Sequence, residues 1–472
     1  MTASDIKRIA YIRSIPVSRA GPYIPELART VTDAGREARI FYTDGDCDAA
    51  DFPGGTWEKL PEDATPDQIV DRVRAWGADG VVSLSFPDEA GLRDAVVKEK
   101  LARHGIPMVS NGLDPSRLLA DKWETKKILA DHGLDTPHGM LVDGTLLKNG
   151  AAEVPVYADI IRLKAEEIGY PLLTKAVWGS SGNGIRFIRD RAELEEYLAT
   201  PDEGNHVLER CITGELCTVE LVGADGEYAV QPLCFTGPTG GRPTFAFWEL
   251  RSSAPRPADD AAFEPVAEKL KKLCTTLGIT GVINLDIIYS GGTYYVLEIN
   301  PRVSGATALG VAASGRNTYL GMTEILLGQW QAPAGPVLPR RRWSLEFPVH
   351  NVTDAFVEQA EQALDVVQIT PTLVVDGREY GGLMIASCEY GDEARFLQVI
   401  TDLDTTHQVL RPEMRTQLGE LLTGSAAQSG PATRLTGPAA QAAVTEQAVT
   451  EQAATGQAAA TAPAAATGRA TV

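Results

Sequence analysis

The sequence predicts a multidomain protein of mixed α/β and α+β class that ends in a disordered tail. Three observations lead to this class. Short apolar strands alternate with amphipathic helices over residues 1–115, a glycine turn joins two apolar strands within residues 281–299, and the composition changes abruptly after residue 424. A chain of 472 residues is also too long for one hydrophobic core, so about three domains are expected.

Residues 1–115 are predicted to form a small parallel sheet with helices on its faces, because strands and helices alternate along them. The expected strands are Ile6–Ser14, Glu37–Tyr42, Asp79–Ser85 and Ile106–Ser110, and the expected helices are Tyr23–Gly35, Pro66–Gly77 and Glu89–His104. The segment lacks a GxGxxG motif, so we do not predict a dinucleotide site there.

Residues 116–331 are predicted to form a second domain with two halves, residues 136–212 and residues 213–331. A helix is expected over Asp114–Gly133, with Asp114 as its cap and Pro115 at its first position. Strands expected at Gly281–Ile288 and Thr293–Ile299 are joined by Ser290-Gly291-Gly292, which is a hairpin signal.

A Pro/Gly-rich linker separates this domain from a small α+β unit predicted over residues 340–423. Strands are expected there near Thr372–Val375 and Phe396–Ile400. Residues 424–472 consist mainly of Ala, Thr, Gln, Gly and Pro, and such a segment cannot bury enough apolar area to offset its ordering entropy. We therefore expect a disordered tail.

The bulk composition argues against several classes of partner and location. A net charge of −20 argues against nucleic acid or an anionic membrane surface as a partner, because either would require a basic surface. The six cysteines form no CxxC pair, the N-terminus lacks a signal-peptide pattern, and no run approaches the ~18 apolar residues of a membrane span. A cytoplasmic protein is expected.

The segment Leu172–Ile188 carries the first functional pattern. A strand bearing Lys175 leads into the glycine-rich turn Gly179–Gly184, and a second strand comes after it. Glycines allow backbone N–H groups to approach a phosphate closely, and a lysine supplies a positive charge for its oxygens. Taken alone, the segment fits a glycine-rich hairpin with a solvated lysine equally well.

The segment Gly292–Ser304 carries the second pattern. A hydrophobic strand is expected to place Glu298 and Asn300 on one face, because side chains alternate along a strand, and Asp286 on the preceding strand is able to lie opposite them. Two carboxylates and an amide oxygen suit Mg²⁺, and Arg302 comes next in a position for phosphate. The alternative is an ordinary surface ion pair between Glu298 and Arg302.

A third pattern lies in Val207–Glu220. Glu209 ends an expected strand and precedes a short connector that is able to present backbone groups to a purine edge, while Glu215 is placed to accept a hydrogen bond from a ribose hydroxyl. For this segment alone, solvated acids at a strand end are the better explanation.

Together these patterns resemble the ATP-grasp superfamily over residues 5–330. The matching order along the chain is Asp121-Lys122, Lys175 with its glycine-rich turn, Glu209, Gly214-Glu215, Asn284 and Asp286, and finally Glu298-Ile299-Asn300-Pro301-Arg302. The EINPR sequence is the most specific of these motifs, and all the motifs in this order are far more specific than any one of them alone.

The resemblance implies a fold, ligands and residue roles. Residues 1–115 would be the pre-ATP-grasp domain, residues 136–212 the ATP lid and residues 213–331 the metal-binding and catalytic half. The turn at residues 179–184 would cover a reactive intermediate. The implied ATP contacts are Lys122 and Lys175 on the phosphates, Ser180, Ser181 and Gly182 in the turn, Glu209 with the backbone of Cys211 or Ile212 at adenine, and Glu215 at ribose. Asp286, Glu298 and Asn300 would hold Mg²⁺, with Mn²⁺ as an alternative, and catalytic Arg302 would steady the γ-phosphate and the acyl phosphate.

The residues directly after Arg302 suggest the branch of the superfamily. Residues 303–315 read VSGATALGVAASG, whereas a biotin carboxylase continues into a QVEH-like segment, and a carbamoyl-phosphate synthetase carries the unit twice. The small residues are similar to those of single-unit amino-acid ligases, so we favour a carboxylate–amine ligase that joins amino acids in a biosynthetic pathway. The alternatives are an enzyme that acts on bicarbonate or another small acid, and a nucleotide-binding module without turnover, which the complete residue set disfavours.

Substrate residues are expected within Phe245–Arg256 and directly after Arg302. Arg251 is the candidate for clamping a substrate carboxylate, although a surface-paired loop arginine is an equal alternative. Trp248 is a candidate pocket residue that fits a core position better, and Ser304 and Gly305 are candidates for cradling an amino acid backbone. The expected partners are small-molecule carboxylates and amines, and a homodimer is compatible with the sequence. The linkage formed, α or γ, stays open.

Overall fold

The computed structural model describes residues 6–147, 154–179, 184–239, 249–253, 256–372, 374–375, 378–379 and 381–423. The tail predicted over residues 424–472 lies outside this part of the chain. No helix in the described part is long and apolar enough to cross a membrane. All six cysteines lie in it, and none forms a disulfide.

The N-terminal region forms the parallel sheet that the sequence predicts, with strand order β3-β2-β1-β4-β5. Its strands are β1 (Arg8–Arg13), β2 (Glu37–Tyr42), β3 (Thr56–Lys59), β4 (Gly80–Ser83) and β5 (Met108–Val109). Its helical elements are the 3₁₀ turn η2 (Val17–Ala20) and the helices α1 (Tyr23–Asp33), α2 (Pro66–Trp76) and α3 (Asp88–Ala102). Strand β3 was not predicted, because this edge strand is largely exposed and its sequence, TWEK, has no apolar run.

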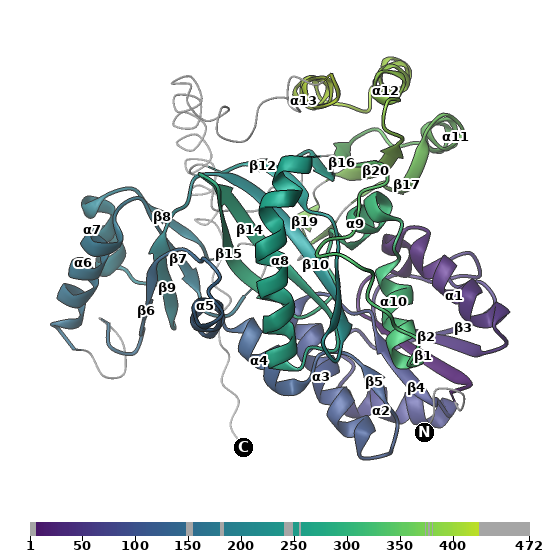
Figure 1. The fold of residues 1–472 in the computed structure, drawn as a ribbon, viewed down its shortest axis with the longest axis horizontal. Helices are drawn as coiled ribbons and strands as arrows, with labels where there is room; N and C mark the ends of the chain where they lie inside the picture. The colour runs from purple at the N-terminus through teal and green to yellow at the C-terminus, as the bar shows by residue number, and fades with distance from the viewer. Residues whose placement is uncertain are drawn as a thin grey trace, which may run out of the picture. The chain divides into compact units, whose positions relative to one another are not determined.

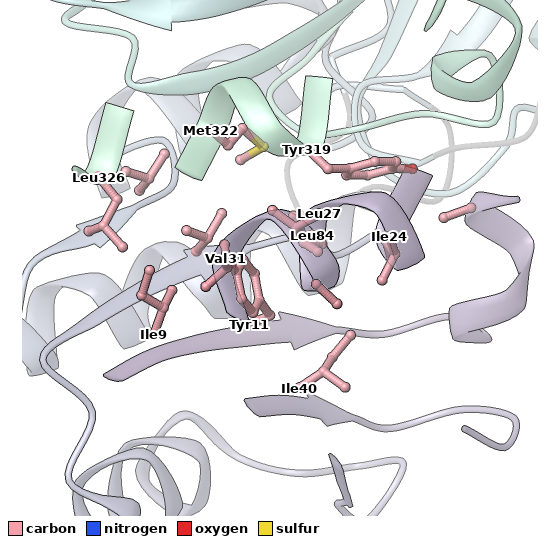
Figure 2. Packing of buried hydrophobic residues seen from close by; sticks show 14 of the residues in the cluster. Ile9, Tyr11, Ile24, Leu27, Val31, Ile40, Leu84, Tyr319, Met322 and Leu326 are labelled. Carbon is pink, nitrogen blue, oxygen red and sulfur yellow. The ribbon is translucent and has the colours of Figure 1, made fainter. Parts of the chain in front are cut away.

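One hydrophobic core joins this sheet to a helix that comes some 300 residues later in the sequence. Figure 2 shows Tyr319, Met322 and Leu326 of α10 (Thr318–Leu326) facing side chains from α1 and the parallel sheet. The hydroxyl groups of Tyr11 and Thr323 are also hydrogen-bonded across this interface at 3.2 Å. The N-terminal domain is therefore packed directly against the region that carries the predicted ATP site.

The single helix predicted over Asp114–Gly133 is wrong. Two helices occupy this stretch, α4 (Leu113–Ala120) and α5 (Lys122–Asp131), and the backbone between them is extended at Asp121. The Asp121 carboxylate accepts hydrogen bonds from the backbone N–H groups of Trp123 and Glu124, whereas Asp114 caps no helix. The acidic cap therefore starts a new helix at Lys122.

The half predicted over residues 136–212 contains a four-stranded antiparallel sheet in the order β6-β9-β7-β8, with two helices beside it (Figure 1). Its elements are β6 (Gly139–Val142), α6 (Tyr157–Ile168), β7 (Leu172–Ala176), β8 (Arg186–Ile188), α7 (Arg191–Ala199) and β9 (His206–Arg210). This arrangement brings Lys175 on β7 beside Val207 on β9, two residues from Glu209.

A nine-stranded sheet forms the second half, with the order β15-β14-β10-β12-β13-β16-β20-β17 and with β11 beside β10. Its strands are β10 (Glu215–Ala224), β11 (Glu227–Val230), β12 (Cys234–Pro238), β13 (Arg251–Ser253), β14 (Gly281–Ser290), β15 (Thr293–Asn300), β16 (Trp343–Val349), β17 (Asp365–Thr370) and β20 (Gly382–Cys388). The strands after residue 340 therefore continue the sheet that carries Glu298.

Helices cover both faces of this sheet. The helix α8 (Pro257–Leu277) packs on one face through Phe263, Ala267 and Leu270, and the helices α9 (Thr307–Ser314) and α10 pack on the other. Thr218 and Glu220 of β10 lie on the α9 and α10 face, because Glu220 accepts hydrogen bonds from Thr307 and Thr318. This face of β10 therefore carries polar side chains.

The remaining elements are α11 (Asp354–Ala363), the paired short strands β18 (Val374–Val375) and β19 (Arg378–Glu379), α12 (Glu393–His407) and α13 (Pro412–Leu422). The predicted strand at Phe396–Ile400 is wrong, because these residues lie within α12. Phe396, Ile400 and Leu403 recur at helical spacing and are buried in the core of this region. A short apolar run does not distinguish a strand from a buried helix face.

Candidate active site

The predicted metal ligands lie on a hairpin whose register brings them together. Asp286 on β14 is directly opposite Glu298 on β15, and Asn284 is directly opposite Asn300. The bulge after Asp286 leaves both pairs in register. Because directly opposite residues point to the same face of an antiparallel sheet, the two carboxylates and the two amides form one polar patch.

The two carboxylates share this small space, and their pKa values move apart. Desolvation and the adjacent Glu298 carboxylate raise the pKa of Asp286 to about 7. Desolvation also acts to raise the pKa of Glu298, but the positive charges of Lys122 and Lys175 outweigh it and the net pKa is lowered. The pair therefore holds negative charge mainly on Glu298, in the field of two lysines.

Lys122 connects this carboxylate pair to the residues that follow β7. Its Nζ lies 3.5 Å from a carboxylate oxygen of Glu298 and donates a hydrogen bond to the Gly179 carbonyl oxygen at 2.5 Å. Its backbone N–H donates to the Val177 carbonyl oxygen at 3.1 Å. The capped start of α5 therefore places a lysine between the hairpin and the beginning of the glycine-rich turn.

The structure places Glu209 between two lysines. Lys126 Nζ and Lys175 Nζ lie 2.6 Å and 2.5 Å from different carboxylate oxygens of Glu209, which is 2% exposed. Lys126 is absent from the predicted site residues. Its spacing of four residues from Lys122, on the same helix face, is the signal in the sequence that identifies it.

Glu215 forms a tight ion pair with Arg256. Both carboxylate oxygens accept hydrogen bonds from Arg256, at 2.7 Å and 2.8 Å, and the guanidinium group lies 3.8 Å from the ring centre of Phe235. Desolvation acts to lower the pKa of Arg256, but Glu215 raises it. Arg256, which was not predicted, fixes the orientation of the acid expected to bind ribose.

Arg251 does not lie on a loop, because residues 251–253 form β13 between β12 and β16. Its guanidinium group pairs with Glu346 at 2.5 Å, and both residues are buried. Glu346, which the sequence did not identify, is the directly opposite residue on β16. The charge of Arg251 also acts to lower the pKa of Asp286, and the Asp286 carboxylate acts to raise the pKa of Arg251.

Arg302 is held by the N-terminal domain. Its Nε donates a hydrogen bond to Asp88 at 2.6 Å, and its guanidinium group lies 4.5 Å from the ring centre of Phe86. Its positive charge also acts to lower the pKa of Asp286. Asp88 and Phe86, which begin and precede α3, were not predicted as site residues.

The remaining predicted residues fall into two groups. The backbone N–H of Cys211 donates a hydrogen bond to the Pro171 carbonyl oxygen, and the Ile212 carbonyl oxygen accepts one from the Thr239 hydroxyl group. The Ser304 hydroxyl oxygen accepts a hydrogen bond from the backbone N–H of Ala306, just before α9, and Gly305 is exposed. Ser180, Ser181, Gly182 and Trp248 lie outside the described residues.

The donor set fits a magnesium ion that also contacts phosphates. Within the described residues no group of three or more His, Cys, Asp or Glu side chains is placed to hold a metal ion. The predicted set has only two carboxylates, Asp286 and Glu298, with Asn300 as a neutral oxygen donor. Mg²⁺ is typically bound by one or two carboxylates and completes its octahedral shell with phosphate oxygens and water.

Comparison with known proteins agrees with this geometry. Residues 119–306 match the ATP-grasp domain family. The carbamoyl-phosphate synthase of Methanobrevibacter smithii is 25% identical over 256 residues, which are 53% of this chain and 65% of that protein. The chain therefore spans slightly less than two thirds of the length of this curated relative.

Two solved structures share the fold. An L-amino acid ligase from Bacillus licheniformis has a TM-score of 0.59 at 19% identity, over 84% of this chain and 97% of that one. The biotin carboxylase domain of the Hydrogenobacter thermophilus 2-oxoglutarate carboxylase has a TM-score of 0.63 at 15% identity, over 89% and 95%. Residues 119–306 thus match an ATP-grasp domain, and the chain shares with both solved structures the fold, with an N-terminal parallel sheet, that its motifs indicate.

Proposed function

We propose that this protein is an ATP-dependent ligase that joins a carboxylate to an amine, with amino acids as both substrates. The observation that carries the proposal is the Asp286–Glu298 pair in the field of Lys122 and Lys175. Two carboxylates that hold a metal ion, together with two lysines, suit the binding and neutralisation of a nucleoside triphosphate. The specificity for the acyl substrate would then depend on neighbouring residues.

Some of these residues would bind the metal ion, and others would bind the phosphates. Asp286, Glu298 and Asn300 would hold Mg²⁺, which when bound would neutralise charge on the phosphate oxygens. Lys122 and Lys175 would grip the same phosphates from the lid side. Because Lys175 is paired with Glu209, and Lys126 is paired with the same carboxylate, Glu209 stays neutralised when Lys175 turns towards a phosphate.

The chemistry has two steps. A carboxylate oxygen of the first substrate attacks the γ-phosphorus, and ADP leaves with the bond electrons. The amine of the second substrate then attacks the acyl carbon, the carbon–oxygen bond breaks, and inorganic phosphate leaves as the amine releases a proton to solvent. Arg302 would steady the phosphoryl oxygens in both steps, and Arg251 would orient the substrate carboxylate.

Two features support amino acids. Residues 303–315 carry small side chains, a composition similar to that of single-unit amino-acid ligases, and the fold matches nearly the whole length of a bacterial L-amino acid ligase. The second candidate is a carboxylase-type reaction with bicarbonate. It is favoured by the TM-score of 0.63 with a biotin carboxylase domain and by the curated carbamoyl-phosphate synthase relative.

The deciding experiment measures phosphate release from Mg·ATP by the purified protein with amino acids, singly and in all pairs, and with bicarbonate. Mass spectrometry of the products accompanies each assay. We expect release that depends on an amino acid pair, together with a product lighter than the pair by one water. Release with bicarbonate alone would instead support the carboxylase-type reaction. Glu298→Gln serves as the inactive control, and Glu361→Gln, on the exposed face of α11, as the active one.

A further inference from the structure

Glu220 is a buried carboxylate that has hydrogen bonds but no cation. It lies on β10, is 5% exposed, and accepts hydrogen bonds from the hydroxyl groups of Thr307 and Thr318 at 2.5 Å and 2.6 Å. No lysine, arginine or histidine in the described part of the chain forms an ion pair with it. Hydroxyl groups solvate a carboxylate but do not neutralise it, and buried charges are normally paired.

A small cavity lies beside this carboxylate. Its volume is about 10 Å³, which suits a group of the size of one water molecule. An ammonium group has this size. The polar side chains that line the cavity come from β10, β12, β14, the start of α9 and the segment after β11, and they are Thr218, Glu220, Gln231, Cys234, Asn284 and Thr307.

These lining side chains have already used their hydrogen atoms elsewhere. The amide group of Asn284 donates two hydrogen bonds to β10, and that of Gln231 donates two around the start of α10. The hydroxyl groups of Thr218 and Thr307 donate to a backbone carbonyl of β14 and to the buried carboxylate, and the Cys234 thiol donates to a backbone carbonyl oxygen. Oxygen atoms with free lone pairs therefore line the cavity, and such a lining accepts a hydrogen-bond donor rather than an anion.

The cavity lies on the sheet face that carries the predicted metal ligands. Asn284 is directly opposite both Glu220 and Asn300, so these three residues form one row across β10, β14 and β15. Asp286 and Glu298 belong to the next row of the same face. Alternate residues of a strand share a face and are about 7 Å apart. Glu220 is therefore one row away from the two carboxylates that are expected to hold the metal ion.

The separation of the two rows suits an α-amino acid. Its ammonium nitrogen lies about 3 Å from its carboxylate oxygens. With one metal contact or hydrogen bond at each end, the molecule extends over about 8 Å, which is close to the spacing between the rows. A substrate whose carboxylate lies at Asp286 and Glu298 is thus able to place its ammonium group in the cavity beside Glu220.

The other charges on this face do not supply the missing cation. Each nearby cation forms an ion pair with a carboxylate other than Glu220, and these cations are Lys122, Lys175, Arg251 and Arg302. Asp286 and Glu298 add negative charge to the face and so do not compensate Glu220. A ligand would therefore have to bring the positive charge, and a primary ammonium group brings it together with three N–H donors.

We propose that Glu220 binds the ammonium group of the acyl-donor substrate, so that this substrate is an α-amino acid rather than a simple carboxylic acid. The inference rests on the ligase function proposed above, in which Arg251 orients the carboxylate of the same substrate. Thr307 and Thr318 orient the Glu220 carboxylate. Burial raises the pKa of Glu220 to about 7, and an ammonium group in the cavity would lower this pKa and keep the carboxylate ionised.

The test compares the best acyl-donor amino acid from the pairwise screen with its deamino analogue, which is the same acid with hydrogen in place of the ammonium group. Tandem mass spectrometry of the product identifies the donor, and phosphate release is measured with saturating Mg·ATP and acceptor. In the wild-type enzyme the deamino acid should have a KM about 10- to 100-fold higher, as expected for the loss of a charged hydrogen bond.

The variants assign this difference to Glu220. Glu220→Gln should raise the KM of the amino acid by a similar factor, and should leave the KM of the deamino acid and the KM of ATP within about twofold. Glu220→Asp keeps the charge and should restore part of the preference for the amino acid. The exposed Glu361→Gln on α11 should change none of these values.

Each outcome separates the two proposals. A wild-type enzyme that joins amino acids but has the same KM for the deamino acid would overturn the ammonium site alone. The same holds if Glu220→Gln keeps the preference of the wild type, or raises both donor KM values equally. A wild-type enzyme that joins no amino acids would overturn the ligase function and this inference with it. A folding defect in Glu220→Gln would change the KM of ATP as well, and Glu220→Asp would then provide the comparison.

Discussion

Asp88, in the first turn of α3, and Arg302, shortly after β15, form an ion pair with 2.6 Å between Oδ1 and Nε. The two residues are separated by 214 positions in the sequence. The Arg302 side chain is only 7% exposed, and the Phe86 ring lies against its guanidinium group. The N-terminal domain thus fixes the arginine that the EINPR motif contributes to the site.

Asp88→Asn should therefore reduce kcat by about 10-fold, with a smaller effect on the KM of ATP, because Arg302 loses a charged partner but keeps its charge. Steady-state phosphate release measures both constants. Asp88→Glu should recover most of the rate, and the exposed Asp63→Asn should be indistinguishable from wild type. An unchanged kcat in Asp88→Asn would show that Asp88 does not position Arg302 for catalysis.

Glu298→Gln should lower kcat on the order of 10³-fold, because the substitution removes a charged ligand for the metal that neutralises the transferred phosphoryl group. Binding of ATP should weaken much less, since Lys122 and Lys175 are retained. The measurements are single-turnover phosphate release and a titration with a fluorescent ATP analogue. A variant that loses affinity but keeps its rate would argue for a purely nucleotide-binding role.

Glu209→Gln should destabilise the protein by about 3 kcal/mol, because it leaves the buried amines of Lys126 and Lys175 close together without their shared counter-charge. The free energy of unfolding in urea measures the effect. The double variant Lys126→Met/Glu209→Gln should regain at least half of the loss, since only one lysine remains. Glu62→Gln, on the exposed surface, is the matched control. Equal stability of the single and double variants would contradict this account of the lysine pair.

Glu220 should make stability fall as pH rises from about 5 to 8. Burial raises the pKa of Glu220 to about 7, and the hydrogen bonds from Thr307 and Thr318 only partly offset this effect. Between its ordinary pKa of 4.5 and about 7, the folded protein holds a proton that the unfolded chain has released. The resulting stabilisation is complete below pH 4.5, is lost as pH rises through 7, and amounts to about 3 kcal/mol.

Urea unfolding of the wild type and of Glu220→Gln at several pH values between 5 and 8 isolates this contribution. The amide does not titrate, so the stability of the wild type relative to the variant should decline across the interval. Parallel pH profiles for the two proteins would mean that the Glu220 carboxyl is not protonated in the folded state near neutral pH.

Much of the fold was predictable because its signals are local. The alternation of strands and helices over residues 6–110 depends on apolar periodicity, and the hairpin at residues 281–300 depends on two adjacent glycines with positive φ. Prediction failed where the local signal is absent or ambiguous. The exposed edge strand β3 lacks an apolar run, and the five residues Phe396–Ile400 of α12 resemble a strand when they are considered alone.

The sequence by itself determined the spacing along single elements, and the order of its motifs predicted Lys122, Lys175, Asp286, Glu298, Asn300 and Arg302 as one set through their resemblance to the ATP-grasp superfamily. Strand alternation and a hairpin register are short-range consequences of backbone geometry, so they are legible without the fold. The tertiary structure alone decided the partners that come from distant segments. Asp88 contacts Arg302, Lys126 contacts Glu209, and Glu346 contacts Arg251 only because separate layers pack together. Such contacts depend on which buried surfaces fit each other, and that information is spread over the whole chain.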